Sequence, residues 1–188
     1  MLERVSIPEG KMGAWEVSRF VVSDEDAQRQ MFQMMKTGRY TPPGEYTKLT
    51  RSGYLVMSDT PDEMRDHYEI VRQASGHVLI NGLGIGMVLR AVLKKPEVKR
   101  VTVVEKSADV IALVGPSYAS ERVEIVHADA FDYQPPKGVR YGAVWHDIWD
   151  DICGDNLAGM TKLKRKYGRR ADWQGCWCEY QCKRGRGR

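Results

Sequence analysis

The sequence predicts an α/β protein: a parallel sheet with helices on both faces, preceded by a small extension that contains a β-hairpin and a helix. Three observations predict it. Residues 77–90 read as a buried strand, a turn with glycine at alternate positions and the opening of a helix. Strand-like and helical segments then alternate up to residue 177, which is the pattern of successive βαβ units. The predicted core strands run into polar residues at the carboxyl ends, where open parallel sheets bind their ligands.

The N-terminal extension is assigned to residues 1–60. Apolar and polar residues alternate over 14–22, which indicates a strand. A serine followed by three acidic residues is typical of a helix start, so a helix is expected over 23–36. Two short strand-like stretches within 46–57 surround Arg51-Ser52-Gly53, and they therefore read as a hairpin.

Residues 61–180 are assigned to the domain that holds the parallel sheet, and residues 181–188 to a basic tail. Pro61 stands at the first position of a helix, where proline is favoured, and Pro96 ends the helix that follows the glycine turn. The elements expected in order are a helix over 60–74, a strand over 77–81, a helix over 87–95, a strand over 101–105, a helix over 107–114, a strand over 122–129, a connector over 132–138, a strand over 141–147, a helix over 155–167 and a strand over 171–177.

Length and composition are those of one globular domain with a small appendage. The chain has 188 residues, of which 42% are hydrophobic and 29% charged. It contains no apolar run of the roughly 18 residues that a membrane span requires, and its N-terminus lacks an apolar signal segment. A cytoplasmic protein without a membrane segment is therefore the default expectation.

Cysteine spacing and charge distribution bear on metals and partners. Cys176, Cys178 and Cys182 do not have the spacing of zinc ligands, so reduced structural thiols are expected and no metal site. Residues 161–188 carry ten Lys or Arg and two Asp or Glu, whereas the rest of the chain has 19 basic and 23 acidic residues. The basic C-terminal region could contact nucleic acid, although a solvated helix face and a frayed tail are favoured.

The glycine turn and the next strand together indicate an adenosyl-ligand site. Gly82, Gly84 and Gly86 follow the first core strand, and Glu105 ends the second strand 19 residues after the last of these glycines. Glycine permits close backbone approach to a ligand, and an acid at about this distance can accept hydrogen bonds from ribose hydroxyls. A nicotinamide-dependent dehydrogenase is less favoured because the turn lacks the G-x-G-x-x-G spacing.

Residues 77–151 resemble the core of class I S-adenosylmethionine-dependent methyltransferases. The resemblance implies a Rossmann-like fold of that class, shortened at its C-terminus. It also implies that the glycine turn lies under the methionine and ribose of the cofactor, that Glu105 holds the ribose hydroxyls, and that Asp129 contacts the adenine amino group with Ala130 or Phe131 lining the adenine pocket. The cofactor-binding residues expected are Asn81, Gly82, Leu83, Gly84, Gly86, Glu105, Lys106, Asp129, Ala130 and Asp147.

Within that class, residues 46–151 are most similar to the spermidine synthase-like branch. The glycine turn with its following Leu89-Arg90, the approach to Glu105, and the hairpin and helix before the core all resemble that branch. Asp147-Ile148-Trp149-Asp150 resembles its D-x-x-D element, in which the first acid deprotonates the attacking amine and the second helps to hold it. The branch usually has Ser-Ser between the two acids, and its members continue into further strands that complete a polyamine pocket.

Asp147 is the favoured catalytic residue, as the base or the group that orients the acceptor. His146 is a second candidate because its ordinary pKa is near neutrality. Adjacent strand residues face opposite sides, so only one of the two is expected in the pocket. Trp149 could stack on a planar or cationic acceptor. Asp150 is a third candidate, although Asp150 and Asp151 could equally cap a helix.

The sequence thus predicts a methyltransferase that uses S-adenosyl-L-methionine and an unknown, small-molecule acceptor. One alternative is an aminopropyltransferase that acts on a diamine with decarboxylated S-adenosylmethionine. Another is a non-catalytic module that binds an adenosyl ligand or nucleic acid. A homo-oligomer, in which a neighbouring subunit closes the site, stays open as a hypothesis.

Overall fold

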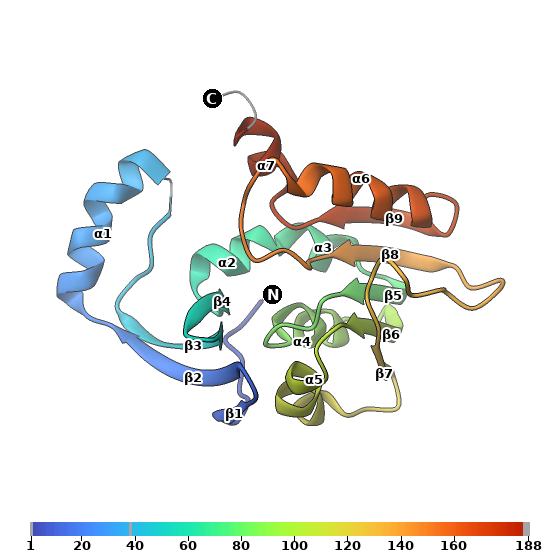
Figure 1. Ribbon diagram of the computed structural model, residues 1–188, viewed down its shortest axis with the longest axis horizontal. Helices are drawn as coiled ribbons and strands as arrows, with labels where there is room; N and C mark the ends of the chain where they lie inside the picture. The colour runs from blue at the N-terminus through green and yellow to red at the C-terminus, as the bar shows by residue number, and fades with distance from the viewer. Residues whose placement is uncertain (1, 38, 186–188) are drawn as a thin grey trace.

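The computed structural model of the chain describes residues 2–37 and 39–185 and contains two sheets (Figure 1). The N-terminal sheet has four antiparallel strands in the order β1-β2-β3-β4. The elements of this part are β1 (Gly10–Met12), β2 (Trp15–Val22), α1 (Asp24–Thr37), β3 (Gly44–Arg51) and β4 (Tyr54–Ser58).

The predicted hairpin is confirmed by β3 and β4. Its turn has Ser52 at φ 51° and Gly53 at φ 83°, and positive φ at both central residues suits a two-residue hairpin. The predicted strand over 14–22 corresponds to β2. The sequence did not indicate that β2 pairs with β3 along its whole length, from Trp15 opposite Arg51 to Val22 opposite Gly44. This pairing turns the extension into a sheet.

The second sheet has five parallel strands in the order β7-β6-β5-β8-β9, which confirms the predicted fold class. Its strands are β5 (Gly76–Asn81), β6 (Val98–Glu105), β7 (Val123–His127), β8 (Tyr141–His146) and β9 (Ala171–Cys176). The chain proceeds outward from β5 to β7 and then returns to the other side of β5 with β8. The crevice at the carboxyl ends of β5 and β8 is therefore a topological switch point, where such sheets bind ligands.

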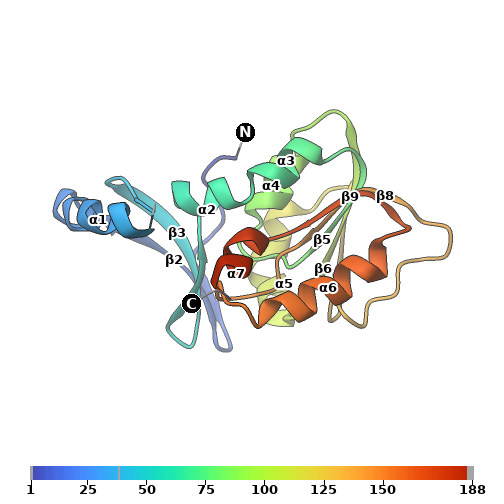
Figure 2. The same ribbon diagram turned by 90° about the horizontal axis from the view of Figure 1, so that it is seen from above.

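Helices cover both faces of the parallel sheet (Figure 2). Because side chains alternate along a strand, Val78 and Ile80 of β5 join the core with the helices before and after β5, whereas Leu79 packs with Tyr167 of the helix on the opposite face. These helices are α2 (Pro61–Asp66), α3 (Tyr68–Gln73), α4 (Met87–Leu93), α5 (Ala108–Val114), the short 3₁₀-helix η1 (Gly115–Tyr118), α6 (Asn156–Tyr167) and α7 (Glu179–Gly185). In the part of the chain described, none of the helices combines the length and hydrophobicity needed to cross a bilayer.

The single helix predicted over 60–74 is two helices, α2 and α3, that meet at His67. This residue has φ −102° and ψ 6°, outside the helical region, and its side chain is fully buried. Its ring packs edge-on against Trp145 of β8, with centroids 5.8 Å apart. The break thus lets a polar ring enter the core beneath the edge of the sheet where β8 ends.

The chain past β9 contains a helix that the sequence did not indicate. α7 includes residues 181–185 of the segment assigned to a basic tail, while residues 186–188 lie outside the described residues. Cys182 of α7 packs with Cys176 and Met160, and the four cysteines are free thiols. The first part of the segment is therefore held to the body by an apolar contact.

Candidate active site

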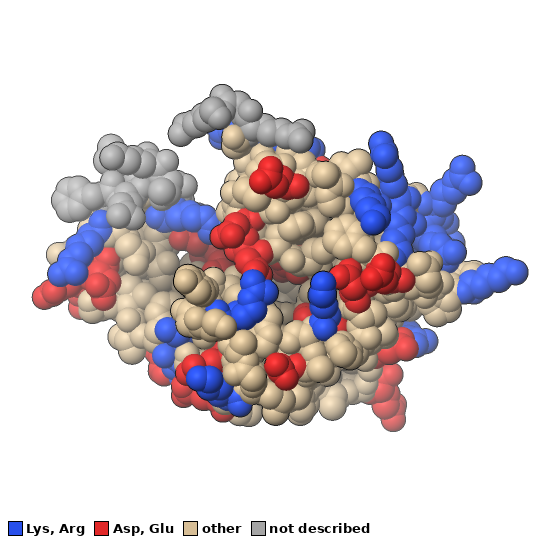
Figure 3. All heavy atoms as spheres, viewed as in Figure 1, with Lys and Arg blue, Asp and Glu red and all other residues tan. Residues whose placement is uncertain are grey.

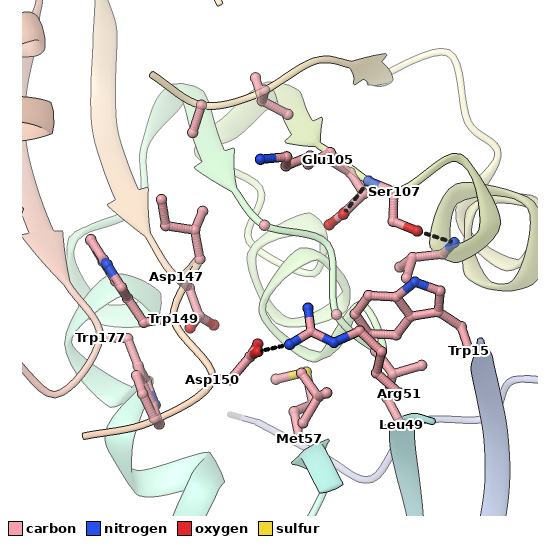
Figure 4. Close-up of a pocket in the computed structure, with 18 of the residues that line it drawn as sticks. Trp15, Leu49, Arg51, Met57, Glu105, Ser107, Asp147, Trp149, Asp150 and Trp177 are labelled. Atoms are coloured by element: carbon pink, nitrogen blue, oxygen red, sulfur yellow. Dashed lines mark hydrogen bonds and ion pairs between the residues drawn. The ribbon is translucent and has the colours of Figure 1, made fainter. Parts of the chain in front are cut away.

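A cavity of about 540 Å³ lies at the switch point, next to the carboxyl ends of β5, β6 and β8. Its volume is in the range of pockets that hold small molecules. Loops of the parallel sheet form one side, and the N-terminal sheet forms the other (Figure 4). The predicted site residues that line it are Gly82, Gly84, Glu105, Lys106, Asp129, Ala130, Asp147 and Asp150.

Protein contacts account for the first two glycines of the turn. Gly82 and Gly84 have φ values of 99° and 52°. A Cβ on Gly82 would lie 1.9 Å from the carbonyl oxygen of Asp147, and one on Gly84 would lie 2.1 Å from Sδ of Met57. The sequence attributed these glycines to the close approach of a cofactor. The structure adds a second reason for glycine, because a side chain at either position would also meet neighbouring protein atoms.

Glu105 ties the end of β6 to the glycine turn. Its Oε2 accepts a hydrogen bond of 2.8 Å from the backbone N–H of Leu83. Its Oε1 accepts one of 2.8 Å from the N–H of Ser107 (Figure 4). Each carboxylate oxygen can accept a second bond, so two ribose hydroxyls still find acceptors here. The arrangement orients the carboxylate into the cavity and holds the turn next to it.

Asp129, at the end of β7, is held by two neighbours. Its Oδ1 accepts a hydrogen bond of 2.8 Å from the N–H of Phe131, and its Oδ2 lies 2.8 Å from Nζ of Lys106. The Lys106 ammonium, together with the backbone bond, lowers the pKa of Asp129 below its usual value. This end of the cavity therefore holds an ionised carboxylate, and Phe131 lines the cavity as well.

Asp147 begins the loop after β8, and its backbone N–H donates a 2.8 Å hydrogen bond to the carbonyl of Asn81. Burial, together with the nearby carboxylates of Glu63 and Asp66, raises the pKa of Asp147 to about 8. Its Oδ2 lies 3.7 Å from Nε2 of His67. Burial lowers the pKa of His67 to about 3, so the imidazole is neutral and does not offset the charge of Asp147.

His146 does not reach the cavity, which removes this second catalytic candidate from the site. It faces the opposite side of the sheet, where its Nδ1 lies 2.8 Å from Nδ2 of Asn81 and its ring is 5.5 Å from that of Tyr167. It is fully buried, and burial lowers its pKa to about 4. Of the two adjacent residues, only Asp147 lines the cavity.

Three expected cofactor-binding residues also lie outside the cavity lining. Asn81 is buried with His146 beneath the sheet. Leu83 is buried and contributes its backbone N–H to Glu105. A Cβ on Gly86 would lie 2.1 Å from the ring of Tyr118, so this glycine serves helix packing. These residues support the turn from behind, and none of the three is among the residues that line the cavity.

Asp150 lines the cavity and forms an ion pair with Arg51 of β3, so it does not cap a helix (Figure 4). Arg51 lies directly opposite Trp15 in the pairing of β2 with β3, and its Cζ is 5.3 Å from the centroid of the Trp15 ring. The ion pair connects residues 99 positions apart in the chain. It joins the N-terminal sheet to the loop after β8 across the cavity.

Sequence reasoning missed the wall that the N-terminal sheet supplies. It consists of Trp15, Leu49, Arg51, Val56 and Met57, and Glu63 of α2 and Trp177 after β9 also line the cavity. The hairpin was predicted, but nothing in its pattern indicates which body of the protein it faces. Glu63 follows Pro61 in the first turn of α2, and burial raises its pKa.

Some of the basic residues in the C-terminal part of the chain form ion pairs or lie away from the cavity. Lys and Arg gather at the edge of the molecule that holds the starts of β8 and β9 (Figures 1 and 3), opposite the carboxyl edge where the cavity opens. There Arg140 binds Asp172 and the carbonyl of Arg169. Lys164 and Lys183 both pair with Glu179.

No protein-family model matches the sequence, and no curated protein matches it. Solved structures match in fold. The spermidine synthase of Thermotoga maritima is 17% identical over 88% of this chain and 52% of its own, with a TM-score of 0.50. The 23S rRNA methyltransferase ErmE is 18% identical over 62% of this chain and 47% of its own, with a TM-score of 0.48.

The N-methyltransferase NodS of Bradyrhizobium japonicum WM9 is 13% identical over 59% of this chain and 63% of its own, with a TM-score of 0.46. The chain thus spans between about half and two thirds of the length of these three structures. At these identities the similarity is one of fold. The predicted α/β fold, with a parallel sheet between helices, is confirmed at that level.

Proposed function

We propose that the protein is an S-adenosylmethionine-dependent transferase that moves a methyl group to a small acceptor. One observation carries the proposal: the ends of four adjacent parallel strands bring the glycine turn, Glu105, Asp129 and Asp147 into one cavity. Glu105 faces the position expected for a ribose, and Asp129 with Phe131 faces that of an adenine. Asp147 lies across the turn from both, at the end where transfer would take place.

The electrostatics of the cavity favour a cationic ligand. Among the described residues that line it there are five carboxylates, Glu63, Glu105, Asp129, Asp147 and Asp150, but two cations, Arg51 and Lys106. Both cations already form ion pairs with lining carboxylates. A positive ligand would relieve the repulsion that contributes to the raised pKa of Asp147. A sulfonium fits this requirement, whereas an anionic cofactor such as a dinucleotide does not.

When bound, S-adenosylmethionine supplies a methyl carbon attached to a good leaving group. The acceptor's lone pair forms the new bond to that carbon, the electron pair of the carbon–sulfur bond stays on sulfur, and the acceptor's proton passes to Asp147. The chain's contribution is then positioning and proton removal. Trp149 and Trp177, which line the cavity beside Asp147 (Figure 4), provide apolar faces that exclude water and pack against the acceptor.

Replacing Glu105 with glutamine tests the cofactor site. We expect the affinity for S-adenosylmethionine, measured by calorimetry, to fall about tenfold or more, since a charge-assisted acceptor for two hydroxyls is lost. Glu124→Gln is a matched control, because Glu124 also lies on a strand of the sheet but pairs with Arg100 at the surface. Equal affinity in Glu105→Gln and wild type, or no binding by the wild type at millimolar ligand, would contradict the proposal.

The pH dependence of transfer provides a second prediction. Since the pKa of Asp147 is raised to about 8, kcat/KM for the cofactor should rise about tenfold per pH unit below 8 and level off above it. A bound sulfonium favours the carboxylate, so the corresponding limb of kcat should lie at lower pH. Rate measurements from pH 6 to 9.5 with a known acceptor check both limbs. A flat kcat/KM profile would exclude Asp147 as the base.

One observation also favours aminopropyl transfer from decarboxylated S-adenosylmethionine. The carboxylates around Asp147 suit a cofactor that lacks a carboxylate and a diamine acceptor, both of which are positively charged. Calorimetry with the two forms of the cofactor discriminates between the candidates. Tighter binding of the decarboxylated form would make aminopropyl transfer the better description of the site.

A further inference from the structure

The two cations of the cavity lie at different ends and have different surroundings. Lys106 pairs with Asp129 at the end expected to hold adenine. Arg51 belongs to the opposite wall, formed by the N-terminal sheet, and is near Met57 and Asp150 (Figure 4). A ligand whose adenosine contacts Glu105 and Asp129 can extend its other end toward this wall, which lines the same cavity. Arg51 is then the described lining cation that this end of the ligand meets.

The guanidinium of Arg51 is held in place and keeps donors for a ligand. Trp15 lies opposite it on β2, with 5.3 Å between Cζ and the ring centroid. The attraction of a cation to an aromatic face uses none of the N–H donors of the guanidinium. Among the described residues its ion-pair partner is Asp150, which it contacts through Nη2. The side chain is half exposed, so the remaining donors are accessible from the cavity.

We propose that Arg51 binds the carboxylate of the cofactor's amino-acid end and thereby sets a preference for S-adenosylmethionine over its decarboxylated form. This inference rests on the proposed function. Without a cation, a ligand carboxylate at this end would meet the acidic side chains of Asp150 and Glu63 and, above about pH 8, the charged Asp147 as well, and like charges repel. The fork of an arginine can hold a carboxylate through two parallel hydrogen bonds. In the absence of ligand the guanidinium of Arg51 pairs with Asp150, and a ligand carboxylate would share this guanidinium with Asp150 or displace Asp150 from it.

The test uses four ligands that differ at the amino-acid end. S-adenosylmethionine and S-adenosylhomocysteine have the carboxylate, decarboxylated S-adenosylmethionine lacks it, and 5′-methylthioadenosine lacks both carboxylate and ammonium. Calorimetry is carried out on the wild type, on Arg51→Met and on Arg19→Met. Arg19 is a matched control because it belongs to the same sheet, pairs with Glu9 and Glu45 and does not line the cavity.

In Arg51→Met we expect binding of the two carboxylate ligands to weaken about tenfold or more. Binding of 5′-methylthioadenosine should stay within about twofold of wild type, which also shows that the variant is folded. Decarboxylated S-adenosylmethionine should bind as well or better, because a positive charge near a positive ligand has been removed. Arg19→Met should leave all four affinities unchanged.

Asp150→Asn gives an independent readout, because it removes the group that competes for Arg51. We expect it to strengthen S-adenosylhomocysteine binding about threefold or more without changing that of 5′-methylthioadenosine. Equal binding of S-adenosylmethionine by wild type and Arg51→Met would overturn the role of Arg51 and leave the proposed function standing. Equal weakening of the binding of all four ligands by Arg51→Met would also overturn the role of Arg51. A wild-type protein that prefers the decarboxylated ligand would overturn that role as well. A wild-type protein that binds none of the four ligands would overturn both proposals.

Discussion

Replacing Asp147 with asparagine should abolish most of the transfer activity and, at alkaline pH, stabilise the protein. The loss of activity is expected to be about 10²- to 10⁴-fold in kcat, the range for removal of a general base. Asparagine has nearly the same shape and keeps the backbone bond to Asn81. The variant therefore removes a charge and a proton acceptor from an otherwise unchanged cavity.

The stability effect follows from the direction of the pKa shift. The folded state raises the pKa of Asp147 from 3.8 to about 8, so the folded protein holds a proton that the unfolded chain has lost between these values. The stabilisation that protonated Asp147 contributes to the folded state is fully present below about pH 4 and is lost as the pH rises toward 8. Above pH 8 the wild type contains a partly buried, charged carboxylate with other acidic side chains nearby, and asparagine does not.

Thermal unfolding at pH 5 and pH 9 measures this effect. At pH 9 the free energy of unfolding of Asp147→Asn should exceed that of the wild type by on the order of 2 kcal/mol, which corresponds to roughly 4–8 °C in Tm. At pH 5 the difference in stability should be much smaller. Asp172→Asn is the control, since Asp172 is exposed and pairs with Arg140. Parallel pH curves for the wild type and Asp147→Asn would show that Asp147 is not protonated in the folded protein, and full turnover would show that it is not the base.

Replacing Gly82 with alanine should disrupt both the fold and the site. The new Cβ would lie 1.9 Å from the carbonyl oxygen of Asp147, a backbone atom that cannot rotate away. The ends of β5 and β8 are joined here by the hydrogen bond from Asp147 to Asn81. They would have to separate, which moves the expected base away from the cofactor site. We expect a loss of about 3 kcal/mol or more in the free energy of unfolding and no detectable cofactor binding.

Gly53→Ala is the matched control for Gly82→Ala. Gly53 has φ 83°, close to the 99° of Gly82, but a Cβ there would have no atom within 4 Å. It should cost only the strain of left-handed backbone, about 1–2 kcal/mol, and should leave ligand binding unchanged. Denaturant unfolding and calorimetry of both variants separate strain from collision. If the two variants lose the same stability, the contact between the strand ends is not what requires glycine at position 82.

The sequence determined the parallel sheet and the carboxyl edge of the site, because both depend on local patterns. Glu105 and Asp129 follow apolar runs directly, and parallel strands bring such ends to one edge of the sheet. The three core acids that line the cavity, Glu105, Asp129 and Asp147, were all named from these patterns. The hairpin was also local, since Ser52 and Gly53 form its turn.

Only the tertiary structure decided which neighbours these residues meet. Strand alternation states that His146 and Asp147 face opposite sides, but the position of α6 and Tyr167 determined which side is core for His146. A side chain at Gly84 would collide with Met57, a residue of another sheet. Such contacts depend on how the two sheets pack against each other. The hydrophobic pattern within one sheet carries no information about the residues of the other.

Arg51 and Asp150 show the same division at the site itself. Each belongs to a segment whose local structure the sequence predicted or marked as a loop, yet 99 positions separate them in the chain. Their meeting depends on β2 pairing with β3 in a register that places Trp15 beneath Arg51. The sequence thus determined the half of the cavity built by consecutive strands, and the packing of one sheet against the other decided the half that would select the ligand.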